Sequence, residues 1–311
     1  MPGAAAAAVP GCAASMTSDI LLQFCVAGVT YGVIYGVVAI GFTIIYNTTG
    51  IINFAQGEFL MLGAMTAVTL QRFVPLPAAI LGAVAITMLV GAALEVLFIR
   101  WLTRPSVLRM IMITIGLSIV IREVALHVWD EKSHALPYFT GDAVSALTVA
   151  GAKISPQVLW VVGVCGAMVL LLGLFFHATP LGRQMRACAS NRDAARLCGI
   201  NARNMVTLSF VLSAGMGALA GCVVSPITFV QYDSGTALAI KGFTAAILGG
   251  LGSTAGAAAG GVVLGLLESF SVWFLPAAYK DAVAITVMLG VLFVRPTGIL
   301  GNAEAARLRG H

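Results

Sequence analysis

Long runs without charge are the feature that most constrains this chain. Five stretches contain no Asp, Glu, Lys or Arg, and each is long enough to cross the hydrocarbon core of a bilayer as a helix, which takes about 20 residues. These stretches are Ile20–Tyr46, Phe73–Leu94, Ile154–Gly182, Asn204–Tyr232 and Gly242–Leu267. Because backbone groups in lipid must be hydrogen-bonded within the protein, such runs predict membrane-spanning helices.

The composition points the same way. The chain has 311 residues, of which 59% are hydrophobic and only 9% are charged, whereas soluble proteins are about 25% charged. The mean hydropathy is +1.00, and the alternating strands of about 10 residues that a membrane β-barrel needs are missing from the sequence. We therefore expect an all-α fold: a polytopic helical membrane protein with about eight transmembrane helices, including broken or re-entrant segments.

The ends of the chain differ from this apolar body. The first fifteen residues, MPGAAAAAVPGCAAS, lack the Lys and Arg that open a signal peptide. We expect residues 1–16 to be a disordered extension, or to precede a true start at Met16. Residues 17–301 form the expected transmembrane domain, in which Val107–Val128 and Asp281–Arg295 are further spans, and residues 302–311 form a cytoplasmic tail.

Basic residues suggest which loops face the cytoplasm, because Lys and Arg prefer cytoplasmic loops. Arg100, Arg104 and Arg109 cluster in one loop, five arginines lie between residues 183 and 203, and Arg295, Arg307 and Arg309 lie near the end of the chain. We expect these three regions inside and the mixed-charge segment 129–156 outside. The side on which the N-terminus lies is not determined by this pattern.

Glycines at helical spacing predict close helix packing. Gly28, Gly32 and Gly36 are four residues apart, and so are Gly252, Gly256 and Gly260. Small residues at this spacing let a second helix approach closely. The second set belongs to a Gly/Ala-rich segment that begins at Lys241 and has room for two shortened helices, with a break near Gly249–Ser253.

A polar segment, NTTGIINFAQGE (Asn47–Glu58), interrupts the first apolar region. Non-helical backbone at membrane depth is tolerated only where protein buries it or water reaches it. The segment is therefore either a re-entrant element beside a transport path or an interfacial loop. Thr49, Asn53, Gln56 and Glu58 are candidates to line the path; the alternative is that they cap broken helices through side-chain hydrogen bonds.

The motifs of several enzyme classes are missing from the sequence. The Gly-rich stretch GGLGSTAG (Gly249–Gly256) lacks the Lys of a phosphate-binding loop, and neither HExxH nor GxSxG occurs. The four histidines are scattered and the six cysteines lack metal-like spacing. We expect a protein that is not an enzyme, with no catalytic residues, no metal site, no cofactor bound by this chain and no nucleic-acid partner.

Few ionisable residues fall within the expected spans, namely Glu58, Glu95, Arg122, Glu123 and Glu268. Such residues are costly in a membrane and often functional. A carrier driven by an ion gradient would use them at mid-membrane depth, and Glu58 is the candidate for that role.

The arginine-rich segment has the spacing Asp193-Ala194-Ala195-x3-Gly199. Alanine and arginine favour helix and Gly199 suits a C-terminal cap, so a short cytoplasmic helix is expected. The spacing resembles the EAA loop of ABC importer permeases, with Asp193 in place of the usual Glu. That resemblance implies a docking element for an ATPase subunit, and the residues assigned to it are Gly182, Arg183, Arg186, Asp193, Ala194, Ala195 and Gly199.

Four segments together resemble the LivH-type inner-membrane permeases of branched-chain amino acid ABC transporters. They are TGIINFAQGEF (Thr49–Phe59), LGRQMRACASNRDAARLCGIN (Leu181–Asn201), KGFTAAILGGLGSTAGAAAGG (Lys241–Gly261), and YKDAVAI with RPTGILG (Tyr279–Gly301). The resemblance implies a multi-pass protein of the bacterial inner membrane. It also implies four kinds of partner: a LivM-type second permease, two cytoplasmic ATP-binding subunits that use ATP and Mg, a periplasmic substrate-binding protein and the lipid bilayer.

The resemblance specifies the substrate less closely than the family. Leucine, isoleucine and valine are the substrates it implies, but related permeases serve urea, short amides and other small polar solutes. Gln56 stands where the family commonly has His, so the substrate differs if this side chain lines the path. An ion-coupled secondary carrier is the alternative of another class, because broken Gly-rich segments and Glu58 fit such a protein.

Overall fold

Six helices of the computed structural model are long and apolar enough to span a membrane. The structure describes residues 10–101, 107–141, 145, 147–149, 152–295 and 298–299. The six long helices are α1 (Pro10–Thr49), α3 (Leu76–Leu94), α4 (Val107–Trp129), α5 (Pro156–Ala178), α8 (Ala202–Thr228) and α10 (Thr254–Ser271). They confirm a polytopic helical membrane protein.

Shorter elements complete the bundle. Three short helices lie among the long ones, α2 (Gln56–Leu70), α9 (Ser234–Gly249) and α11 (Lys280–Val294). The remaining elements are a π-helical turn, η1 (Glu95–Ile99), the helices α6 (Pro180–Ser190) and α7 (Arg192–Leu197), a 3₁₀ turn, η2 (Ala277–Tyr279), and two antiparallel strands, β1 (Leu147–Val149) and β2 (Ala152–Ile154). Within the described residues there are six long helices, or nine helices when α2, α9 and α11 are added. The expected number of about eight spans lies between these two counts.

The expected end regions lie only partly within the described chain. Helix α1 begins at Pro10, so residues 10–16 of the expected extension are helical, whereas residues 1–9 lie outside the described residues. Arg104, Arg307, Arg309 and the expected tail 302–311 also lie outside them.

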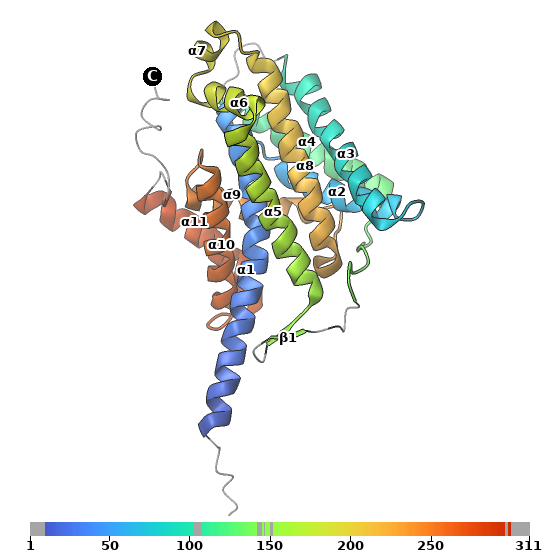
Figure 1. The fold of residues 1–311 in the computed structure, drawn as a ribbon, viewed down its shortest axis with the longest axis vertical. Coiled ribbons are helices and arrows are strands. Elements are labelled where there is room, and N and C mark those ends of the chain that lie inside the picture. Colours follow the sequence, from blue (N-terminus) through green and yellow to red (C-terminus); the bar gives the residue numbers. More distant parts are fainter. Residues whose placement is uncertain are drawn as a thin grey trace, which may run out of the picture.

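Helices α1–α4 and α8–α11 have the same neighbours but run in opposite directions. Helix α1 packs along α10, and in the same way α8 packs along α3. Helix α2 lies against α3 and α8, while α9 lies against α10 and α1. Helix α1 ends, and α8 begins, at the end of the molecule that carries α6 and α7 (Figure 1). The chain is thus built from two inverted four-helix units, an arrangement that many transporters share.

The short helices α2 and α9 meet at their N-termini, Gly57 against Gly235. A Cβ atom at Gly235 would lie 2.9 Å from the Gly57 carbonyl oxygen, and a Cβ at Gly57 would collide with the Gly235 carbonyl oxygen. Two broken segments that are 178 positions apart in sequence are therefore in backbone contact inside the bundle. Only residues without a side chain permit this approach.

Glycines also set the distance between α1 and α10. A Cβ at Gly32 would lie 2.7 Å from the Val262 Cα, and a Cβ at Gly36 would lie 3.2 Å from the Ala258 carbonyl oxygen. From the α10 side, Gly261 and Gly265 face the backbone of α1. Small residues on both helices thus allow a close contact along α1 and α10. Such packing matters because lipid provides no hydrophobic drive to hold helices together.

The second glycine set divides between a helix and a turn. Gly256 and Gly260 lie on α10 and face α9 at Gly249. Gly252 differs from the expected helical position, since it lies in the turn between α9 and α10 with φ of 110°. Ser253 then caps α10 by accepting a hydrogen bond from the Gly256 N–H at 3.0 Å. The break therefore falls where the sequence places it, but Gly252 belongs to it rather than to a helix face.

Candidate functional site

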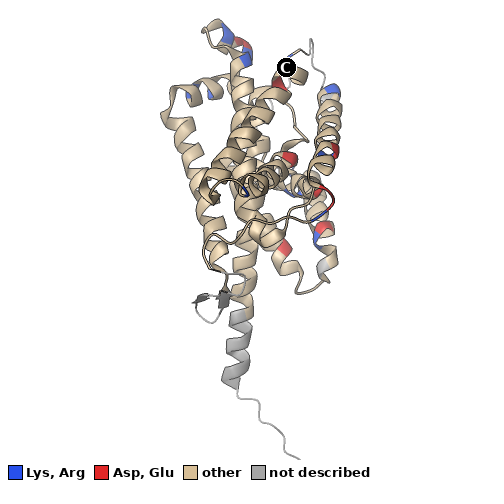
Figure 2. Ribbon diagram, turned by 90° about the vertical axis from the view of Figure 1, so that its right-hand side faces the viewer, with Lys and Arg blue, Asp and Glu red and all other residues tan. Residues whose placement is uncertain are grey.

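Helices α6 and α7 carry the arginine-rich segment and form one end of the molecule (Figures 1 and 2). Each helix begins with a side-chain cap. Thr179 accepts a hydrogen bond from the Gly182 N–H at 3.0 Å, and Asn191 accepts from the Asp193 and Ala194 N–H groups at 3.0 and 2.9 Å. Caps of this kind stabilise a helix by about 1 kcal/mol, which matters for α7 because it has only six residues.

The end of α7 is a Schellman motif, in which a left-handed residue closes the helix. Gly199 has φ of 81°, its N–H donates to the Arg196 carbonyl, and the Ile200 N–H donates to the Ala195 carbonyl, both at 3.0 Å. A Cβ at Gly199 would meet no atom within 4 Å. The position therefore needs glycine for its backbone conformation and not for space.

The residues assigned to docking are brought together on this end of the molecule but differ in exposure. Arg183, Arg186, Asp193, Ala194 and Gly199 are exposed, whereas Gly182 and Ala195 are buried. Gly182 needs its lack of a side chain for space, because a Cβ there would collide with the Phe175 carbonyl at the end of α5. Burial of these two residues seats α6 and α7 on the bundle and leaves the other five facing outward.

Sequence reasoning missed Leu197. Its side chain is 90% exposed at the end of α7, beside Asp193 and Arg196, which form an ion pair at 3.3 Å. A single exposed apolar residue is common on protein surfaces, so Leu197 is of interest only because it lies on the helix expected to dock. The signal was present in the sequence, since Leu197 is the one large apolar residue between Arg192 and Gly199.

Four arginines of the same end surround a cavity of about 270 Å³. It lies between the ends of α1 and α3 and the starts of α4, α7 and α8, and its charged lining residues are Arg100, Arg192, Arg196, Arg203 and Glu95. Glu95 is 2% exposed and accepts a hydrogen bond from the Thr207 hydroxyl at 2.7 Å, while the Arg100 guanidinium lies 3.8 Å from it. Partial burial and then the charge of Arg196 lower the pKa of Arg192.

The polar break between α1 and α2 is buried. Asn53, Gln56 and Glu58 are 2%, 1% and 1% exposed, and the fourth path candidate, Thr49, borders the arginine-lined cavity. Asn53 accepts a hydrogen bond from the Ala55 N–H at 3.1 Å, and Gln56 accepts one from the Ser213 hydroxyl of α8 at 2.5 Å. This geometry favours the re-entrant interpretation of the segment over the interfacial loop. The hydrogen bonds use only some of the polar atoms, because within the described residues Asn53 Nδ2 and Glu58 Oε2 are buried without a hydrogen-bond partner.

Glu58 joins three helices at the point where α2 meets α9. Its Oε1 accepts hydrogen bonds from Ser118 of α4 at 2.8 Å and from Thr236 of α9 at 3.3 Å. The carboxylate also stands at the N-terminal ends of both α2 and α9, where the helix dipoles favour negative charge. Glu58 therefore links α2 of the first unit to α9 of the second through hydrogen bonds.

A second buried charge cluster was not expected from the sequence. Lys241 of α9 lies 2.8 Å from Glu268 of α10 and 2.9 Å from Asp281 of α11, and its ammonium stands 5.5 Å from the centre of the Tyr35 ring of α1. The Lys241 and Glu268 side chains are 15% and 7% exposed. One lysine thus neutralises charges from two other helices of the second unit, where unpaired charges would be costly.

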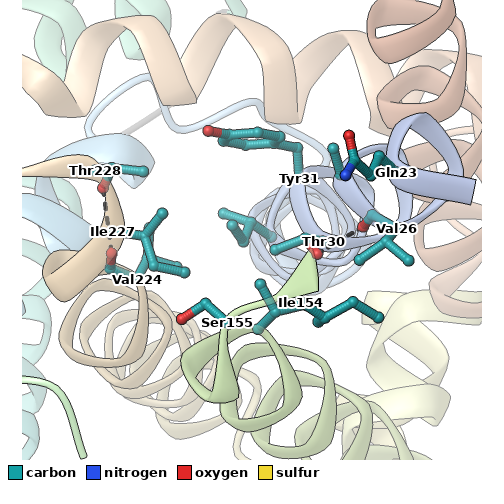
Figure 3. A pocket seen from close by; sticks show the side chains of 12 residues that line it. Gln23, Val26, Thr30, Tyr31, Ile154, Ser155, Val224, Ile227 and Thr228 are labelled. Atoms are coloured by element: carbon teal, nitrogen blue, oxygen red, sulfur yellow. Dashed lines mark hydrogen bonds between the residues drawn. The ribbon is translucent and has the colours of Figure 1, made fainter. Parts of the chain in front are cut away.

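At the opposite end from the arginines, α1, α5 and α8 surround a cavity of about 390 Å³ (Figure 3). Its wall carries aliphatic side chains such as Ile34, Val158 and Ile227, with hydroxyl groups from Thr30 and Tyr31. No charged side chain lines it. Such a lining accepts a neutral solute with an aliphatic part more readily than an ion.

In the described part of the chain, no group of three or more His, Cys, Asp or Glu side chains is placed to bind a metal ion. The described histidines are likewise engaged locally: His127 and His177 each contact a carbonyl oxygen one turn back in their own helix at 2.8 Å.

The fold and these sites define a class: a multi-pass transport permease of the inner membrane. Comparison with known proteins specifies it further. A family model described as branched-chain amino acid transport system / permease component matches residues 24–292. The chain belongs to this family.

Three relatives illustrate the range of the family. The permease BraD of a high-affinity branched-chain amino acid transport system of Pseudomonas aeruginosa is 35% identical, covering 92% of this chain and 98% of its own length. LivH of the corresponding system of Escherichia coli is 33% identical, with 92% and 97% covered. LsrC, a permease of an autoinducer 2 import system of Salmonella paratyphi B, is 29% identical, with 82% and 72% covered.

Proposed function

We propose that this chain is a transmembrane permease subunit of an ATP-driven importer for leucine, isoleucine and valine. The observation that carries the proposal is the similarity to BraD and LivH along nearly the whole chain. The aliphatic wall of the uncharged cavity suits the side chains of leucine, isoleucine and valine, while Thr30, Tyr31 and Gln23 offer polar groups to the amino and carboxyl groups. Urea, short amides and other small polar solutes are the alternative substrates for the same mechanism.

The partners follow from the same family. This chain pairs with a LivM-type second permease, two cytoplasmic subunits bind and hydrolyse ATP with Mg, and a periplasmic binding protein delivers the substrate. The permease itself binds no cofactor and carries out no chemical step. Residues 17–301 form the transmembrane domain of this subunit.

The work of ATP hydrolysis enters through α6 and α7. The exposed residues Arg183, Arg186, Asp193 and Ala194, together with Leu197, contact the ATPase subunit, while Gly182 and Ala195 seat the two helices against α5 and α8. A push on α7 reaches α8 through direct contact, and the hydrogen bond from Thr207 of α8 to Glu95 then connects α8 to the end of α3. Side-chain titration at mid-membrane depth is not required for this coupling.

Among the four path candidates, Thr49 borders the arginine-lined cavity, so we assign it to the cytoplasmic end of the path. Asn53, Gln56 and Glu58 hold the broken segment in place. An Asn53→Ala variant should therefore lose transporter stability before it changes the relative uptake of leucine and valine. A change in substrate preference at unchanged stability would return Asn53 to the path.

Uptake of labelled leucine, isoleucine, valine and urea in cells with and without this gene tests the proposal. We expect loss of the three amino acids, with urea uptake unchanged, and no uptake in ATP-depleted cells. Loss of urea uptake instead would support the same ATP-driven mechanism but with urea as the substrate. Uptake that persists without ATP but follows an ion gradient would favour an ion-coupled carrier.

The docking role has its own test. Asp193 and Gly199 are exposed, so an Asp193→Ala, Gly199→Ala double variant should insert normally but hydrolyse ATP without matching uptake. The measurement is the ratio of solute transported to ATP hydrolysed by the assembled transporter in proteoliposomes. An unchanged ratio would exclude these two residues from docking.

A further inference from the structure

We propose that the arginine-lined cavity binds the phosphate of an anionic phospholipid of the cytoplasmic leaflet. Four guanidinium groups, those of Arg100, Arg192, Arg196 and Arg203, line a cavity whose one carboxylate is Glu95. Arginine suits this ligand because its planar fork of N–H donors matches the oxygens of a phosphate group. The inference does not depend on the substrate of the transporter.

Among the described residues, the positive charges of the cavity are only partly balanced. Glu95 is already engaged, since Thr207 donates to it at 2.7 Å and Arg100 lies 3.8 Å away. Arg196 pairs with Asp193, but at a position where both side chains are mostly exposed to solvent. Among the described residues, the buried Nε atoms of Arg100 and Arg192 have no hydrogen-bond partner. Buried donors without partners are costly, so an anionic acceptor would stabilise this site.

The surroundings of the cavity point to a lipid as the source of that anion. Next to Arg100, the side chains of Leu97, Phe98 and Trp101 are 64%, 47% and 76% exposed, and Leu108 at the start of α4 is 68% exposed. Exposed apolar residues and a tryptophan at the end of a span are typical of the boundary between headgroups and acyl chains. Basic pockets between spans on the cytoplasmic side are known to hold anionic headgroups.

The test measures binding of phosphatidylglycerol and phosphatidylcholine to the full-length chain by native mass spectrometry in detergent. We expect the wild-type protein to prefer phosphatidylglycerol, and Arg203→Gln or Arg192→Gln to reduce that preference about fivefold each, since one basic group near anionic lipid contributes that factor. Arg203→Lys, which keeps the charge but loses the planar fork of donors, should give a preference between those of Arg203→Gln and wild type. Arg203 is exposed at the start of α8, so its substitution leaves the Glu95 cluster intact.

Controls distinguish the possible occupants. Arg183→Gln removes an exposed arginine of the same end that does not line the cavity, and it should leave the preference unchanged. An equal loss in Arg183→Gln would mean diffuse charge attraction and would overturn the proposal. So would competition by inorganic phosphate at millimolar concentration, which would identify a free-phosphate site. If Arg203→Gln instead weakens co-purification of the ATPase subunits at unchanged lipid preference, the cavity receives a protein carboxylate and not a lipid.

Discussion

At the scale of single residues, glycine serves different purposes in different helices of this protein. Gly261 of α10 touches the backbone of α1, where a Cβ atom would collide with Gly36. Gly163 of α5 has open space around it, with nothing within 4 Å of a Cβ. The same residue type is thus a packing requirement in one helix and a cost in the other, because glycine destabilises a helix by about 1 kcal/mol relative to alanine.

This contrast predicts opposite effects of one added methyl group. Gly261→Ala should lower the thermal unfolding temperature of the purified protein by several degrees, since overpacking of a tight contact costs about 1–3 kcal/mol. Gly163→Ala, the matched control, should leave the unfolding temperature unchanged or raise it. Equal effects of the two substitutions would show that the α1–α10 contact does not limit stability.

Lys241 offers a second prediction at this scale. Replacing it by methionine leaves Glu268 buried beside α1 without its cation. Breaking a buried ion pair in this way costs about 3 kcal/mol or more, whereas removing both charges is much less harmful. Lys241→Met should therefore unfold at a markedly lower temperature than wild type, and Lys241→Met with Glu268→Gln should recover most of the loss. A double variant as unstable as the single one would mean that Asp281 is the partner that matters.

At the scale of elements, α7 is a helix that its caps must hold together. Six residues are too few for a stable isolated helix. Asn191 satisfies two N–H groups at its start, and the Gly199 turn satisfies two carbonyls at its end. A short helix held mainly by its ends stays ordered only while both caps are intact.

Asn191→Ala should consequently loosen α7 without disturbing the bundle. The loss of one cap costs about 1 kcal/mol locally, so the backbone amides of residues 193–197 should exchange with deuterium about fivefold faster. The control is Asn204→Ala, an exposed position on α8 whose side chain caps nothing in the described chain. Coupling of ATP hydrolysis to uptake should fall in the first variant and not in the second. Unchanged exchange in Asn191→Ala would show that contacts with α6 and α8 are enough to hold α7.

The elements themselves were largely predictable from the sequence. The span expected at Val107–Val128 is α4 at Val107–Trp129, and the break expected near Gly249–Ser253 separates α9 from α10. Uncharged runs and glycine clusters are local sequence patterns, so they predict helices and breaks without knowledge of the tertiary contacts. Gly252 shows the limit, because four-residue spacing alone does not distinguish a helix face from the turn that precedes it.

The contacts that build the sites were not predictable in the same way. Glu58 receives hydrogen bonds from residues 60 and 178 positions away, and Lys241 pairs across three helices. The sequence shows that these residues are polar groups in apolar segments. Their partners are distant in sequence, so no local pattern identifies them. Leu197 is the reverse case. The sequence shows a large apolar residue within a polar segment, but only the structure shows that its side chain is 90% exposed.

At the scale of the whole molecule, the two inverted units place unlike chemistry at the two ends. The end formed by α6, α7 and the close of α3 holds the arginine-lined cavity, while the uncharged cavity beside α5 lies towards the other end (Figure 1). Because Lys and Arg favour the cytoplasmic side, we expect the arginine-rich end to lie inside and the uncharged cavity to face outward. Under the proposed function, ATP hydrolysis and substrate entry would then act on opposite ends of the bundle.

A native cysteine makes this orientation testable. Cys198 is exposed at the end of α7, whereas Cys165, Cys188 and Cys222 are buried. A membrane-impermeant maleimide should therefore label wild-type protein more than Cys198→Ser in inside-out vesicles, and should label both equally in right-side-out vesicles. Bound ATPase subunits should reduce the labelling of Cys198, because the same surface would be covered. Labelling of Cys198 from the outer face would mean that the molecule has the opposite orientation in the membrane. Helix α7 would then be out of reach of cytoplasmic ATPase subunits, and an ion-coupled carrier would be favoured.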